Sequence, residues 1–82
     1  MKVLPLRADQ ERFLKRRNLL RKYEKQKKLL EENIFHPSLN FELLEPKHMH
    51  IYSFRIDRKY RAVFIFVQSE LIEIVDINNH YQ

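Results

Sequence analysis

Two arginines in the most strand-like part of the chain, and a histidine and a tyrosine near its end, are the residue types best suited to chemistry. Arg55 and Arg61 flank the turn of an expected hairpin, and His80 and Tyr81 stand just before the last residue. Arginine neutralises phosphate with planar donors, histidine transfers protons near neutral pH, and tyrosine donates a hydrogen bond or stacks. If the last three strands are neighbours, these side chains meet on one sheet face and indicate a site for a phosphodiester.

A structural interpretation of the same residues stays open beside this one. In it Arg55 and Arg61 form salt bridges with nearby carboxylates, and the C-terminal residues have no chemical role. The carboxylates that would serve are Asp57, Glu73 and Asp76. Residue types alone favour the structural interpretation, because arginine pairs readily with carboxylates as well as with phosphates.

His48 and His50 are the remaining pair with a spacing of interest. On an extended segment, residues two apart share a face, which would allow a metal pair. No carboxylate or third histidine is well placed beside them, so two exposed loop histidines are the better interpretation. The chain has no cysteine, which excludes disulfides and cysteine-based zinc sites, and it has no Walker or dinucleotide-binding pattern.

Both arginines lie on the strands of the expected hairpin. Residues 51–56 alternate apolar and polar side chains, as on a strand, and residues 57–59 form a polar turn. Residues 60–67 follow as a nearly continuous apolar run, which predicts a strand in the middle of a sheet. Arg61 is the one charge in that run, so its guanidinium must reach water, a carboxylate or a phosphate.

Hydrophobic periodicity and chain-breaking residues predict the other elements. Near the N-terminus they are a strand over 2–6, which Pro5 restricts to a sheet edge or a strand end, and helices over 8–17 and 19–34. Asn18 is the expected break between the helices, with one continuous helix as the alternative. Further along they are a loop or short irregular strand over 39–50 and a strand over 71–77. The order is β-α-α-β-β-β. It predicts a single α+β domain over residues 1–82, with the two N-terminal helices on one face of a small, mostly antiparallel sheet.

The composition and net charge indicate which kinds of partner to expect. The chain has 82 residues, 44% of them hydrophobic, and a net charge of +5. Residues 1–36 contain 11 Lys and Arg against 5 Asp and Glu, which favours a polyanionic partner such as nucleic acid, with a solvated helix face as the alternative. No signal peptide and no apolar stretch of about 18 residues is present, so we expect a soluble cytoplasmic protein with no membrane contact.

The second half of the sequence resembles the RelE/ParE superfamily of bacterial toxins, and within it the YoeB-like branch. The resemblance covers residues 42–81. It rests on Tyr52-Ser53, Arg55-Ile56, Tyr60-Arg61, Val63-Phe64 and the terminal His80-Tyr81. The first 38 residues agree only in their strand, helical hairpin and basic charge. The implied fold is the RelE-like α+β domain described above.

The resemblance implies a ribosome-dependent mRNA endonuclease. Such enzymes bind in the ribosomal A site and cut without a cofactor or metal, by attack of a ribose 2′-hydroxyl on the adjacent phosphate. By position, Arg61 matches the arginine that stabilises the phosphate, His80 the acid/base histidine and Tyr81 the tyrosine that positions the nucleotide. Glu42 matches the general base, with Glu45 as an alternative because the family glutamate lies between prolines.

Two further departures concern the tail: the spacing from Arg61 to His80 is one residue longer than in YoeB, and Gln82 follows the terminal tyrosine. Under the same resemblance, Arg55 and the basic helix residues are candidates for RNA phosphate contacts, with solubilising charge as the alternative. The helix residues are Lys15, Arg16, Arg17, Arg21, Lys22, Lys25, Lys27 and Lys28.

The implied partners are a cognate antitoxin, the ribosome with its RNA, and mRNA. Whether the toxin alone is a monomer or a homodimer stays open. Two other functions on the same fold also stay open. One is a ParE-like toxin that inhibits DNA gyrase without chemistry, and the other is a non-catalytic module that binds nucleic acid or protein.

Overall fold

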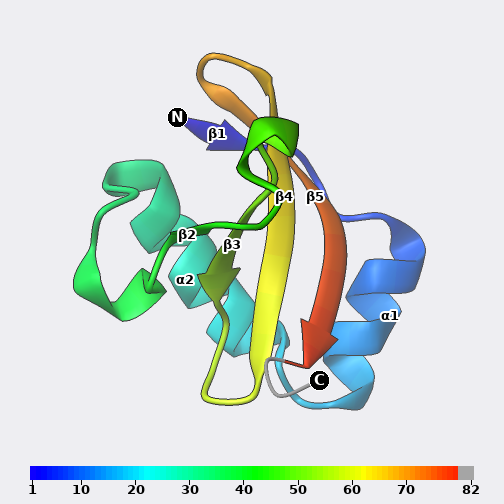
Figure 1. Ribbon diagram of the computed structural model, residues 1–82. Helices are drawn as coiled ribbons and strands as arrows, with labels where there is room; N and C mark the ends of the chain where they lie inside the picture. The colour runs from blue at the N-terminus through cyan, green and yellow to red at the C-terminus, as the bar shows by residue number, and fades with distance from the viewer. Residues whose placement is uncertain (80–82) are drawn as a thin grey trace.

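The computed structural model describes residues 1–79, in which a five-stranded sheet is covered by two helices (Figure 1). The strands are β1 (Lys2–Val3), β2 (Glu42–Leu43), β3 (Tyr52–Arg55), β4 (Tyr60–Gln68) and β5 (Leu71–Asn79), the helices are α1 (Ala8–Arg16) and α2 (Leu20–Glu32), and two 3₁₀ turns are η1 (Pro37–Leu39) and η2 (Lys47–Met49). The predicted α+β class is confirmed. None of the helices among residues 1–79 is long and apolar enough to span a membrane.

The sheet is mostly antiparallel, with strand order β1-β5-β4-β3-β2. Strand β4 is central, as its apolar character on both faces predicted, and it pairs antiparallel with β3 and β5. The parallel pair β1–β5 places β1 at one edge, and β1 ends before Pro5, which cannot donate to a ladder. Strand β2, two residues long, forms the other edge.

Both helices pack on one face of the sheet. Phe13 of α1 contacts the Tyr60 ring edge-on, and Tyr23 of α2 packs against Phe54. The Cα register sets Phe54 opposite Ala62, so these contacts lie on one side of the hairpin. The helices are separated at Asn18, as predicted, because Asn18 has a left-handed φ of 56°, which asparagine tolerates better than most residues.

Buried polar side chains fix the helices to the sheet. The Gln10 amide donates to the Ile74 carbonyl, and the Gln26 amide donates to the carbonyls of Ser38 and Arg55. At the free edge of β1, a Glu31 carboxylate oxygen accepts from the Val3 N–H at 3.0 Å. A backbone donor that would otherwise be open to another strand is thereby satisfied.

The segment from residue 40 to 50 is more structured than a loop. It contains β2, which runs antiparallel to β3, and then η2. His48 and His50 are exposed and do not lie on an extended segment, because His48 lies in the 3₁₀ turn and His50 caps it with a left-handed φ of 52°. Among residues 1–79, no group of three or more His, Asp or Glu side chains is placed to hold a metal ion.

Candidate active site

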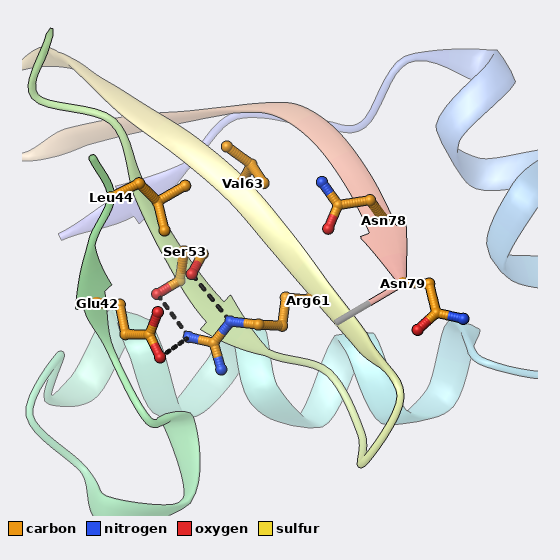
Figure 2. A pocket seen from close by; sticks show the side chains of 7 residues that line it. All are labelled: Glu42, Leu44, Ser53, Arg61, Val63, Asn78 and Asn79. Atoms are coloured by element: carbon orange, nitrogen blue, oxygen red, sulfur yellow. Dashed lines mark hydrogen bonds and ion pairs between the residues drawn. The ribbon is translucent and has the colours of Figure 1, made fainter. Parts of the chain in front are cut away.

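A cavity of about 350 Å³ opens on the face of the sheet that the helices leave uncovered. Its lining residues are Glu42, Leu44, Ser53, Arg61, Val63, Asn78 and Asn79 (Figure 2). The side-chain alternation of β4 explains this location, because Ala62 faces the helices and its neighbour Arg61 therefore faces away from them. Four of the five strands contribute to the cavity, because β2, β3, β4 and β5 each supply at least one lining residue.

Arg61 lies at the floor of this cavity and is only 4% exposed. Its Nε donates to the Ser53 hydroxyl at 2.9 Å, and its Nη2 donates to the carbonyls of Asn40 at 2.5 Å and Ser53 at 3.3 Å. Its Nη1 is buried and has no hydrogen-bond partner among the described residues. The one charged side chain of the central strand is therefore hydrogen-bonded through Nε and Nη2 but not through Nη1.

The charges around Arg61 are unbalanced. Burial lowers the pKa of the guanidinium from its ordinary value, Glu42 opposes this by its negative charge, and Arg55 adds to it by its positive charge. The nearest Glu42 oxygen lies 4.0 Å from Nη2, a loose ion pair rather than a hydrogen bond. Because Arg55 is the Cα partner of Arg61 across the hairpin, two positive side chains share this end of the sheet.

The alternative salt bridges of Arg55 and Arg61 with Asp57, Glu73 or Asp76 are not formed among the described residues. Asp57 accepts from the N–H groups of Lys59 and Tyr60 in the hairpin turn and forms a long ion pair with Lys22. Asp76 accepts from the Ile77 N–H in its own strand. Among the described residues, no carboxylate lies within 4.0 Å of the Arg55 guanidinium.

Of the two candidate bases, Glu42 lines the cavity and Glu45 does not. The physical reason is the register: Glu42 is paired with Ser53 and so shares the face of the Ser53 side chain, whereas Glu45 comes after the end of β2. The Glu42 side chain is nearly half exposed, at 46%, so it can meet both Arg61 and an incoming molecule.

Strand β5 runs to the cavity. It ends at Asn79 rather than at the predicted residue 77, and its Asn78 is the Cα partner of Arg61. The candidate residues His80 and Tyr81 follow directly in the sequence but lie outside the described residues.

The basic helix residues lie on the other side of the sheet from the cavity, in the layer of α1 and α2 (Figure 1). Some are engaged locally: Lys15 pairs with Glu11, Lys22 pairs with Asp57, and the Arg17 guanidinium lies 3.7 Å from the centre of the Phe13 ring. The exposed members without such contacts among the described residues are Arg16, Arg21, Lys25 and Lys28. Of the predicted phosphate contacts, Arg55 is the one that shares a sheet end with Arg61.

Sequence reasoning missed the residues that hold Arg61. Ser53 was noted only as part of a motif, and Asn40 was not singled out. A small hydroxyl side chain in the strand next to a lone strand arginine is a signal that could have found Ser53, since a buried guanidinium needs several acceptors. The contact from Asn40 is made by its backbone carbonyl, so its residue type gives no such signal.

The fold and the cavity together define a small α+β domain with a buried arginine beside a carboxylate on its uncovered sheet face. No protein-family model and no curated protein matches the sequence. Solved structures do match it. A YoeB/ParE toxin from Agrobacterium tumefaciens aligns with a TM-score of 0.73 and 20% identity, over 99% of this chain and 100% of that chain.

A chain of the heterotetrameric YoeB-YefM toxin-antitoxin complex from Staphylococcus aureus aligns with a TM-score of 0.70 and 19% identity, over 98% of this chain and 94% of that chain. A second YoeB-YefM complex from the same organism gives the same values. This chain therefore has the fold of the YoeB/ParE toxins, and the fold expected from the sequence resemblance is confirmed.

Proposed function

We propose that this chain is the toxin of a toxin-antitoxin pair and that it cleaves mRNA on the ribosome. The observation that supports this best is the Arg61 guanidinium, which is buried and charged, lines a cavity shared with Glu42 and lies 4.0 Å from the Glu42 carboxylate. A buried charge without a close counter-ion is costly, and an anionic ligand in the cavity would offset that cost. A scissile phosphate is such a ligand, and phosphoryl transfer needs positive charge at that point.

The proposed reaction is an attack by the ribose 2′-hydroxyl on the adjacent phosphorus. The 2′-oxygen forms a bond to phosphorus and the bond from phosphorus to the 5′-oxygen breaks, which gives a 2′,3′-cyclic phosphate and a 5′-hydroxyl. Glu42 takes the proton of the 2′-hydroxyl, Arg61 stabilises the negative charge of the phosphorane, and His80 gives a proton to the leaving 5′-oxygen. Tyr81 positions the nucleotide, and Arg55 adds positive charge nearby.

Partners follow from the same proposal. The S. aureus relatives in fold are found in complex with YefM. A cognate antitoxin is proposed for this chain by analogy, and the ribosome with its mRNA is proposed as the target. The exposed basic residues of α1 and α2 are suited to ribosomal RNA because phosphate contacts of this kind need charge rather than a shaped pocket.

The test is induced expression followed by mapping of mRNA 5′ ends. Wild-type chain should arrest growth and create new 5′ ends within coding sequences, and Arg61→Ala should abolish both. Arg58→Ala is the matched control, because Arg58 is an exposed arginine in the hairpin turn of the same strand pair.

Growth arrest with intact mRNA would overturn the nuclease proposal. If such arrest came with inhibition of DNA supercoiling, the gyrase-directed function would replace it. Expression without growth arrest would instead favour the non-catalytic binding module.

A further inference from the structure

The Arg61 guanidinium is hydrogen-bonded through two of its three nitrogens. Nε and Nη2 together make three hydrogen bonds, to the Ser53 hydroxyl, the Ser53 carbonyl and the Asn40 carbonyl. Nη1 makes none among the described residues. Figure 2 shows the guanidinium between Ser53 and Glu42, with Nη1 on the side away from the Ser53 contacts.

Ser53 is buried in a position from which it contacts Arg61. It is 1% exposed, it lies on the cavity face of β3, and its hydroxyl accepts from Nε at 2.9 Å. Its carbonyl contacts the same guanidinium through Nη2. One small residue thus contacts two of the three guanidinium nitrogens, which fixes the plane of the group as well as its position.

Asn40 completes the arrangement from a separate segment. It follows η1 with a left-handed φ of 47°, and its carbonyl accepts from Nη2 at 2.5 Å. The turn that ends at Asn40 is fixed from the helix side by Gln26, which donates to the Ser38 carbonyl. The two carbonyls and the hydroxyl therefore come from positions that the fold holds rigidly.

We propose that Ser53 is a positioning residue which, with the Asn40 carbonyl, holds Arg61 so that the guanidinium stays at the cavity and meets a phosphate bound there. The ligand class is a phosphate or phosphodiester. This inference rests on the proposed function for its substrate, but the contact between Arg61 and phosphate can be measured without any cleavage.

The experiment uses full-length chain with ¹⁵N-labelled arginine and inorganic phosphate as the probe. In the wild type, the Arg61 Nε–H should exchange slowly with water because it is buried and bonded to Ser53. Phosphate should shift the Arg61 side-chain signals. Ser53→Ala should speed the exchange of Nε–H and weaken phosphate binding by about tenfold or more, because a hydrogen bond to a charged group is lost.

Three variants keep the result interpretable. Ser53→Thr retains the hydroxyl and should restore slow exchange and phosphate affinity. Ser53→Cys has nearly the size of serine but is a weak acceptor, so it should behave like Ser53→Ala even if the alanine variant folds poorly. Ser69→Ala removes an exposed serine from the β4–β5 turn and should match the wild type.

Folded Ser53→Ala or Ser53→Cys with unchanged exchange and unchanged phosphate affinity would overturn the inference, and so would the absence of any phosphate shift at the Arg61 side chain. Failure of the proposed function has a different signature. In that case phosphate binding would depend on Ser53 as described, while ribosome-bound mRNA stayed intact.

Discussion

Arg61 shows how one residue can be poorly placed for stability and well placed for binding. Removing a guanidinium from water costs several kcal/mol unless hydrogen bonds and an opposite charge compensate. Here the hydrogen bonds are made to neutral oxygens, and the nearest carboxylate, Glu42, is loosely paired at 4.0 Å. The arginine is therefore left with unused capacity to bind an anion, which is the basis of the proposed function.

Tyr23 is a second buried group with an unmet hydrogen bond, and it gives a stability prediction. It is 2% exposed, and its hydroxyl has no partner among the described residues. Tyr23→Phe keeps the ring packing against Phe54 and removes the orphan hydroxyl. We expect the free energy of unfolding at pH 7 to rise by about 1–2 kcal/mol, measured by urea denaturation.

The same variant has a pH signature. Burial raises the pKa of the Tyr23 phenol, and the charges of Glu24 and Glu31 raise it further. The unfolded chain ionises this group near pH 10, while the folded chain keeps the proton, so the stability of the wild type falls as pH rises above about 10. Tyr23→Phe should lose this part of the fall, whereas Tyr60→Phe, at a partly exposed ring, should keep it. A loss of stability in Tyr23→Phe at pH 7 would mean that the hydroxyl has a partner.

At the scale of elements, those with a strong pattern could be predicted from the sequence. The apolar run of β4 predicted its central place in the sheet, and Asn18 predicted the break between the helices. Strand β5 was predicted two residues too short. Asn78 and Asn79 look like a polar tail, but their strand conformation comes from the backbone pairing with Arg61 and Tyr60, which no side-chain pattern reveals.

The segment that completes the cavity could be predicted least. Its elements η1, β2 and η2 are two or three residues each, too short for any periodicity to appear. The position of Glu42 depends on the pairing of β2 with β3, and the contact from Asn40 depends on a backbone carbonyl. The residues assigned to the proposed chemistry were thus suggested by resemblance, while the residues that contact Arg61 had to be found in the structure.

At the scale of the whole molecule, the cavity and the basic helices lie on opposite sides of the sheet (Figure 1). The domain is small, with principal extents of 32 × 26 × 25 Å, so a large particle such as the ribosome could contact both sides at once. This arrangement separates two tasks. Chemistry would belong to the cavity, and electrostatic attachment would belong to the helices.

This separation predicts how a charge-removal variant behaves. Replacing Arg21, Lys25 and Lys28 together with Gln should weaken ribosome association and reduce its salt dependence, by roughly 2 in the slope of log K against log salt for three lost phosphate contacts. Cleavage at saturating chain should be unchanged, because none of the three lines the cavity. Lys59→Gln, in the hairpin turn, serves as the control for loss of an exposed charge. An unaltered slope in the triple variant would identify these residues as a solvated face.

The most direct test of the central claim is cleavage of ribosome-bound mRNA by purified chain, with the ends of the products identified. The wild type should leave a 5′-hydroxyl and a 2′,3′-cyclic phosphate, and an mRNA with a 2′-deoxy nucleotide at the cut site should stay intact. Arg61→Ala, once shown to be folded, should cleave at least about 100-fold more slowly, because it loses the charge that stabilises the phosphorane. Intact mRNA with the wild type, or an unchanged rate in Arg61→Ala, would contradict the account.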